Sequence, residues 1–283
     1  MMQLLTPVEI SRSDRKISHD QELLLLGSCF SDSIGSKLLE YGFRATLNPF
    51  GTLYNPMSIA QTLLLLLSDA NDIDRSMIVC HDNIWHSFLH HSRFSDSDSE
   101  RFCKGIRQSI ACGRENLQKA DILIITFGTS YVFYKDGQVV SNCHKLPATM
   151  FERKRLTVEH ITACWQELLR QPALKDKRII FTVSPIRHKA DGMHGNQLSK
   201  ATLLLAVEQL QTLGCEYFPS YELLLDEMRD YRFYAEDMLH PNEQAVKYIW
   251  ERFGDTYFSD TTKQKAMVAH KEYLRNHHRD IIL

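Results

Sequence analysis

The chain has 283 residues, 43% hydrophobic and 24% charged, so it can bury a full core without support from metal or disulfides. Its 33 basic and 35 acidic residues leave almost no net charge, which disfavours a general nucleic-acid binder. Leucine, aromatic and charged residues are mixed along the whole chain, which excludes intrinsic disorder.

Neither export nor membrane insertion is expected. Residues 1–16 lack the basic start and long apolar stretch of a signal peptide. The longest apolar run, residues 63–67, is far shorter than the ~20 residues that span a bilayer. The 7 cysteines show no paired spacing and no CxxC motif, so we expect reduced thiols, no structural zinc and a cytoplasmic location.

The hydrophobic pattern predicts alternating strands and helices. In chain order we expect a strand at 21–26, a helix at 31–41, a strand at 43–47, helices at 57–67 and 97–119, a strand at 121–127, a hairpin at 131–134 and 138–142, a helix at 157–170, a strand at 178–183, a helix at 197–213, a strand at 215–218, a helix at 242–253 and a helical tail at 261–278.

This alternation indicates an α/β fold, a parallel sheet with helices on both faces, in one domain over residues 1–283. The core of the domain is expected at about 21–255. Residues 73–95 and 130–150 are interpreted as insertions, and the tail as a docked arm or an oligomer contact. The pattern leaves the oligomeric state open.

Four unusual segments follow predicted strands or lie in a late loop, and open parallel sheets bind ligands beyond the carboxyl ends of their strands. They are Gly27-Ser28-Cys29-Phe30, Phe127-Gly128-Thr129-Ser130, Ser184-Pro185-Ile186-Arg187-His188 and Asp237-Met238-Leu239-His240-Pro241. We expect them to converge on one site.

Ser28 and Cys29 lie at the turn from the first strand into the first helix. The helix dipole and the backbone N–H groups there would lower the pKa of a thiol and could hold an oxyanion. The alternative is structural, with Cys29 as a small buried residue and Ser28 as a helix N-cap. The turn alone favours this alternative.

Asp237 and His240 favour a functional role for this turn over the structural alternative. Their spacing lets one turn bring the carboxylate beside the imidazole, which then serves a nucleophile through its other ring nitrogen. Alone, D-x-x-H is a weak signal, but with a nucleophile turn it becomes moderately specific. Cys29 is preferred over Ser28 because a thiol needs less activation at neutral pH.

These blocks together resemble the SGNH/GDSL hydrolase superfamily, and Gly27-Ser28-Cys29-Phe30-Ser31 is similar to the signature of the GSCFA family. The segments at 48–52, 128–129 and 184–185 fit the same family, and the resemblance spans roughly residues 23–253. It implies a three-layer α/β/α sandwich with a flavodoxin-like sheet, and ester hydrolysis or acyl transfer through a covalent acyl-enzyme.

The resemblance also implies roles for single residues. Cys29 takes the place of the nucleophile, with Ser28 as the fallback. His240 acts as general base and then acid, and Asp237 orients it. Residues 128–130 lack the asparagine that holds the oxyanion in the superfamily.

Other groups are therefore expected to hold the oxyanion. They are the backbone N–H of Cys29, together with Gly51, Gly128 and the hydroxyl of Thr129, and Asn55 is an alternative to Gly51.

Several polar residues are candidates for substrate binding. They are Asn55, Asn142, His144, Arg187, His188 and His194. The segment after the third buried strand, which also carries Lys200, could grip an anionic or sugar-like group, and a solvated loop is an equal alternative. His144 could equally be a structural residue at the end of the hairpin. No metal site is expected at residues 86–91, because no carboxylate or cysteine completes the histidines there.

The leading hypothesis is an SGNH-like esterase or acyltransferase that needs no cofactor. Its substrate would be a small-molecule or carbohydrate ester, O-acetylated carbohydrate for example, with neither nucleic acid nor membrane as a partner. The alternative is a non-catalytic module that binds a glycan or an acyl ligand, because the oxyanion asparagine is missing. A redox role for Cys29, which would need a resolving cysteine, is a third and weaker option.

Overall fold

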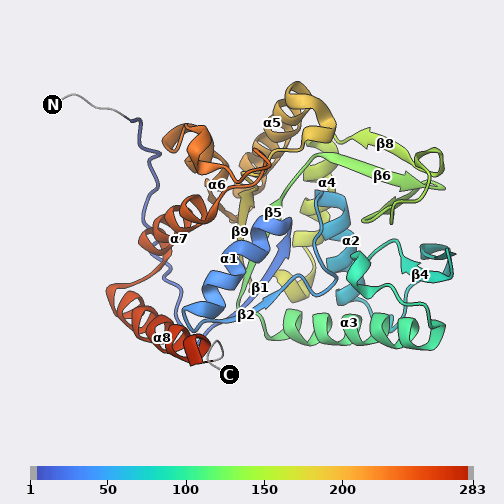
Figure 1. Cartoon of the computed structure of the whole chain (residues 1–283), viewed down its shortest axis with the longest axis horizontal. Helices are drawn as coiled ribbons and strands as arrows, with labels where there is room; N and C mark the ends of the chain where they lie inside the picture. Colours follow the sequence, from blue (N-terminus) through green and yellow to red (C-terminus); the bar gives the residue numbers. More distant parts are fainter. Residues whose placement is uncertain (1–4, 280–283) are drawn as a thin grey trace.

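The structure, a computed structural model, describes residues 5–279 of the chain. Residues 1–4 and 280–283 lie outside this range. The two ends of the predicted 1–283 domain, and the first residues of the segment 1–16, in which no signal peptide is expected, are therefore not described. Five parallel strands form a central sheet with helices packed on both faces (Figure 1). The fold is a three-layer α/β/α sandwich.

The elements fall close to their predicted positions. The strands of the central sheet are β1 (Glu22–Gly27), β2 (Arg44–Leu47), β5 (Ile122–Phe127), β9 (Arg178–Val183) and β10 (Glu216–Phe218). The helices are α1 (Cys29–Glu40), α2 (Pro56–Leu67), α3 (Ser99–Lys119), α4 (Val158–Leu169), α5 (Gly192–Gln211), the short α6 (Ser220–Glu222), α7 (Glu243–Tyr257) and α8 (Asp260–Arg279). Helix α5 begins at Gly192, before the predicted start at residue 197. The sequence does not predict this first turn because it is rich in glycine and polar residues and lacks apolar periodicity.

The central sheet has the strand order β10-β9-β5-β1-β2, with every pair parallel. Counted along the chain, this is the doubly wound order 2-1-3-4-5. The direction in which the sheet grows reverses between β1 and β5, because β2 pairs with one side of β1 and β5 with the other. Ligands of such sheets bind outside the carboxyl ends of the strands at this switch point.

Alternate residues of β1 enter two different cores, which explains its run of leucines. Leu24 and Leu26 pack into the core that contains α2, α3, α4 and α5. Leu23 and Leu25 pack into the core that contains α1 and α7. All four leucines are 2% exposed or less, as expected of a strand covered on both faces.

Two small antiparallel sheets extend from the core. β3 (Ile78–His81) and β4 (Ile84–Ser87) form a hairpin in the first predicted insertion. β6 (Tyr131–Lys135) pairs with β7 (Gln138–Val140), as predicted, and also with β8 (Glu152–Arg155). The sequence does not predict β8, because its residues, ERKR, are charged and exposed and show no apolar alternation.

The predicted polar tail is helix α8, which docks on its own chain beside α1 (Figure 1). The His270 ring stacks on Tyr41 with centroids 4.1 Å apart. Ala269 packs so close to Gly42 that a Cβ there would lie 2.7 Å from the methyl carbon. None of the helices in the described part of the chain combines the length and the apolar character that crossing a bilayer requires.

Candidate active site

The turn from β1 into α1 is as short as the backbone allows, because Gly27 ends the strand, Cys29 begins the helix and Ser28 alone connects them. Gly27 has φ +144°, and a Cβ there would lie 2.2 Å from the carbonyl oxygen of Thr126. Only glycine fits this conformation and this close approach to β5. The turn therefore presents Cys29 at the amino end of α1, at the carboxyl edge of the sheet.

A buried amide fixes this turn. Asn48 accepts a hydrogen bond from the Gly27 nitrogen at 2.8 Å through Oδ1 and donates to Asp32 at 2.7 Å through Nδ2. The hydroxyl of Thr52 donates to the other oxygen of Asp32 at 3.3 Å. Asn48 has φ +39°, a conformation that asparagine tolerates better than most residues. This role of Asn48 is not predicted from the sequence.

Cys29, His240 and Asp237 form one connected chain of contacts. The sulfur of Cys29 lies 3.7 Å from Nε2 of His240, and Nδ1 of the same ring lies 2.5 Å from Oδ2 of Asp237. Since the carboxylate accepts from Nδ1, the Nε2 lone pair faces the sulfur. The backbone N–H groups of His240 and Leu239, followed by the imidazole, hold the pKa of Asp237 at about 2, so the carboxylate is charged at neutral pH.

The thiol of Cys29 rests in its protonated form. Burial is the largest effect and raises its pKa above 9.0, and the carboxylate of Asp32 acts in the same direction. The N–H groups of Cys29 and Phe30 and the ammonium of Lys200 oppose this rise, and they are outweighed. This corrects the prediction that the helix terminus lowers the pKa of the thiol, because desolvation exceeds the effect of the helix. The sulfur therefore depends on a base to become a thiolate.

A family model described as the GSCFA family matches residues 22–253, which contain the sheet and all the contacts above. The chain belongs to the GSCFA family. A comparison with curated proteins finds no match to it.

Within this GSCFA core, Ser28 differs from Cys29 in its surroundings. Its side chain is 1% exposed, and its hydroxyl makes no hydrogen bond to any described residue. It precedes α1 without capping the helix through its side chain, so the N-cap hydrogen bond of the structural alternative is not formed. It is the thiol of Cys29, rather than this hydroxyl, that contacts His240.

Two of the backbone groups expected to hold the oxyanion, those of Gly51 and Gly128, are occupied by the protein itself. The N–H groups of Gly128 and Thr129 both donate to the carbonyl of Tyr54, at 2.9 and 2.8 Å. The N–H of Gly51 donates to the carbonyl of Asn48 at 2.7 Å. The oxyanion roles expected of Gly51 and Gly128 therefore need correction, because a donor already bonded to a carbonyl is not free for a substrate oxygen.

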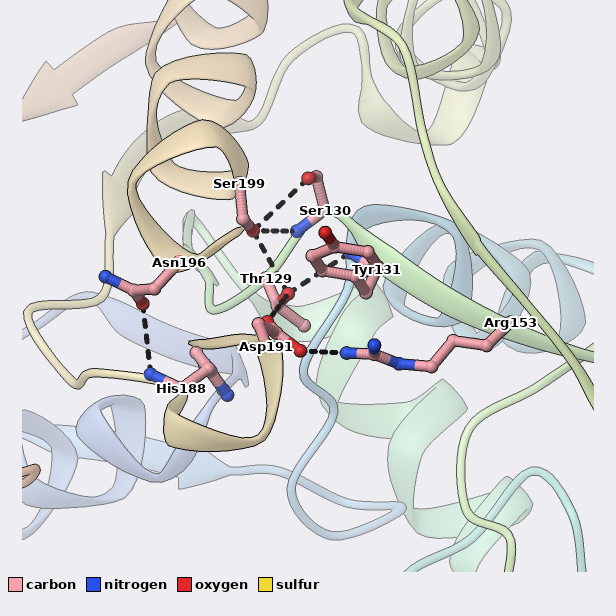
Figure 2. Close-up of polar contacts among 8 residues, drawn as sticks. All are labelled: Thr129, Ser130, Tyr131, Arg153, His188, Asp191, Asn196 and Ser199. Atoms are coloured by element: carbon pink, nitrogen blue, oxygen red, sulfur yellow. Dashed lines mark hydrogen bonds and ion pairs between the residues drawn. The ribbon is translucent and has the colours of Figure 1, made fainter. Parts of the chain in front are cut away.

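The hydroxyl of Thr129 is also engaged, in a polar network that joins β6 and β8 to the start of α5 (Figure 2). Ser199 lies at the centre and bonds the hydroxyl of Thr129 at 3.1 Å and the nitrogen of Ser130 at 2.7 Å. Asp191 accepts from Thr129 at 3.4 Å and pairs with Arg153. Thr129 thus anchors the second insertion.

Two predicted substrate residues are used to hold elements in place. Asn55 caps α2 by accepting from the Ser58 nitrogen at 2.8 Å and donating to the Ser58 hydroxyl at 2.9 Å. Arg187 donates to the carbonyl of Met238 at 3.2 Å from its side chain and to that of Leu239 at 3.1 Å from its backbone. Arg187 thereby positions the loop that carries His240.

The other predicted substrate residues lie in different surroundings. Nε2 of His144 donates to the carbonyl of Ser87 at 2.7 Å, and its ring stacks on His86 at 4.6 Å. Asn142 accepts from the His144 nitrogen at 2.9 Å, and its own nitrogen donates to the carbonyl of Phe88, just after β4, at 3.2 Å. His194 is exposed on the first turn of α5.

Lys200 is a site residue whose importance the sequence analysis missed. It is 1% exposed, and its ammonium donates to the carbonyl of Gly128 at 2.6 Å and to that of Ser184 at 2.7 Å. Burial lowers its pKa to about 7, while Cys29 acts in the opposite direction. Lys200 joins the segments after β5 and β9. Together with the Cys29–His240 contact, the bond from Arg187 to Leu239 and the approach of Ser28 to Gly128, this brings the four predicted segments together. The sequence signal that could have identified Lys200 is its spacing: it lies three residues before Leu203, so both fall on the buried face of α5.

Proposed function

We propose that this protein is a cysteine-dependent acyl hydrolase or acyltransferase of the SGNH type, which works through an acyl-enzyme on Cys29. The observation that carries the proposal is the contact chain from the Cys29 sulfur through His240 to Asp237. The nucleophile turn after β1 and the late D-x-x-H segment occur in the order that this superfamily uses. No cofactor is needed for this chemistry.

The proposed reaction begins with transfer of the thiol proton to Nε2 of His240 while the sulfur attacks the ester carbonyl carbon. The tetrahedral intermediate then breaks its bond to the leaving oxygen, which takes the proton from His240. The remaining thioester on Cys29 is cleaved by water or by an alcohol acceptor, activated by the same imidazole. The raised pKa of the thiol fits this scheme, because the sulfur then needs a base beside it.

The substrate we propose is a small-molecule or carbohydrate ester, O-acetylated carbohydrate for example. Both His240 and Asp237 are nearly half exposed, with side chains 48% and 44% accessible. An ester carried on a larger molecule can therefore reach the pair from solvent. We further propose a cytoplasmic location, since a free thiol nucleophile suits a reducing compartment.

The test is brief incubation with p-nitrophenyl acetate followed by peptide mass mapping. We expect acetyl on the peptide that contains Cys29, together with release of p-nitrophenol. Both signals should be lost in Cys29→Ala and fall about 10²–10⁴-fold in His240→Ala. Cys80→Ala is the matched control, because Cys80 is exposed on β3. Unchanged turnover after His240→Ala would overturn the proposal.

A non-catalytic module is the second candidate, and the occupied N–H groups of Gly51, Gly128 and Thr129 favour it. Such a module would bind an acetylated oligosaccharide in calorimetry and form no covalent adduct in the same sample. An acetyl group on Cys29 would exclude it.

A further inference from the structure

A buried imidazole nitrogen beside the turn that presents Cys29 makes no hydrogen bond of ordinary geometry in the described part of the chain. It is Nε2 of His188, and the neighbouring hydroxyl of Ser28 is equally buried and unbonded. Both residues lie against Gly128, where an added Cβ would stand 3.5 Å from Nε2 of His188 and 3.2 Å from Cβ of Ser28. Glycine at this position lets the imidazole approach the turn that presents Cys29.

The ring of His188 is held in place from two sides. Its backbone nitrogen donates to Oδ1 of Asn196 at 3.0 Å (Figure 2), which fixes the loop to α5. The ring of Tyr54 meets it edge-on, with centroids 6.2 Å apart. Tyr54 also supplies the carbonyl that occupies the N–H groups of Gly128 and Thr129. A fixed, buried polar atom without a partner is costly unless a ligand completes it.

We propose that His188 is the oxyanion donor of this site and bonds through Nε2–H to the carbonyl oxygen of the substrate as the Cys29 sulfur adds to it. This inference rests on the proposed function and supplies the donor that Gly51, Gly128 and Thr129 cannot provide. The N–H at the start of α1 is the second donor. His240 remains the only imidazole that transfers a proton.

The protonation of His188 suits this role. Burial is the largest effect and, with the electrostatic influence of Lys200, His240 and Arg153, lowers its pKa to about 3, while the backbone of Gly128 acts in the opposite direction. The imidazole is therefore neutral at physiological pH and carries one N–H. Such a ring is a poor base, and it stabilises developing negative charge by hydrogen bonding alone.

The experiment compares two reactions of the same sulfur. Acetylation of Cys29 by p-nitrophenyl acetate passes through an oxyanion, whereas its alkylation by iodoacetamide does not. In His188→Ala and His188→Leu we expect acetylation to slow about 10²–10³-fold and alkylation to stay within about twofold. His188→Gln keeps an N–H near the position of Nε2 and should recover most of the acetylation rate. His160→Asn, at an exposed position on α4, is the control.

The outcomes separate this inference from the proposed function. If wild-type protein acetylates Cys29 and the His188 variants do so equally fast, His188 is no oxyanion donor while the function stands. If acetylation and alkylation fall together, or His188→Gln recovers nothing, His188 only supports the fold and the inference is overturned. If wild type forms no adduct on Cys29 at all, the proposed function fails first. Melting temperatures within a few degrees of wild type establish that each variant is folded.

Discussion

The side-chain oxygen of Asn48 accepts a hydrogen bond from the backbone nitrogen of Gly27 at 2.8 Å. One buried amide thereby ties the residue that follows β2 to the turn that presents Cys29. The same amide reaches the first turn of α1 through Asp32 at 2.7 Å. The position of the Cys29 sulfur thus depends on a residue that takes no part in the proposed chemistry.

Replacing Asn48 by alanine should destabilise the fold and slow the acylation of Cys29. Asn48→Ala leaves the buried N–H of Gly27 unpaired, which costs about 1–3 kcal/mol, and places alanine at φ +39°. Urea unfolding and the acetylation rate measure the two effects. Asn83→Ala is the matched control, because Asn83 has φ +60° in an exposed turn and loses only the conformational preference, about 1 kcal/mol. Equal losses in the two variants would contradict the role of the amide.

The glycine at the end of β1 should tolerate no side chain. In Gly27→Ala the added carbon would lie 2.2 Å from the carbonyl oxygen of Thr126, so β1 and β5 must separate or the turn must change. We expect a loss of about 3 kcal/mol or more in the free energy of unfolding. Gly105 lies inside α3, where no atom lies within 4 Å of an added Cβ, so Gly105→Ala should instead raise the free energy of unfolding by about 1 kcal/mol. Chemical unfolding of both variants checks the contrast, and a tolerated Gly27→Ala would refute it.

The buried ammonium of Lys200 should make stability depend on pH. Its pKa is about 7 in the folded protein and about 10.5 in an unfolded chain. Between these values the unfolded chain binds a proton that the folded protein has released, so stability rises with pH. Unfolding free energies of wild type and Lys200→Met should therefore diverge in favour of wild type from pH 7 to 10. Because the titrations of Cys29 and Lys200 are coupled, the comparison is made with Cys29→Ala in both proteins, and a constant difference would disprove the burial effect.

Alkylation of Cys29 should report a thiol rather than a preformed thiolate. Because burial raises the pKa of Cys29 above 9.0, its rate with iodoacetamide should keep rising beyond pH 9. At pH 7.5 Cys29 should react more slowly than the exposed Cys80 of the same sample, as followed by mass mapping. A rate that reaches its plateau below pH 7 would mean a stable thiolate–imidazolium pair instead.

The sequence predicts those parts of the structure that depend on local pattern. Strands β1, β5 and β9 are continuous apolar runs because both of their faces are covered, and such runs are visible in one dimension. The contact between Asp237 and His240 follows from their three-residue spacing. Strand β8 escapes prediction because its residues, ERKR, are charged and exposed and show no apolar alternation.

What the sequence by itself determined is the family, the parallel sheet and the residue types at the site, since these depend on hydrophobic period and short motifs. Only the tertiary structure decided which groups are free and which are desolvated. The carbonyl of Tyr54 reaches the N–H groups of Gly128 and Thr129 across more than seventy residues of chain, and so removes both as donors. Burial sets the protonation of Cys29, Lys200 and His188, because the cost of a charge depends on the atoms packed around it, and these come from every segment of the fold.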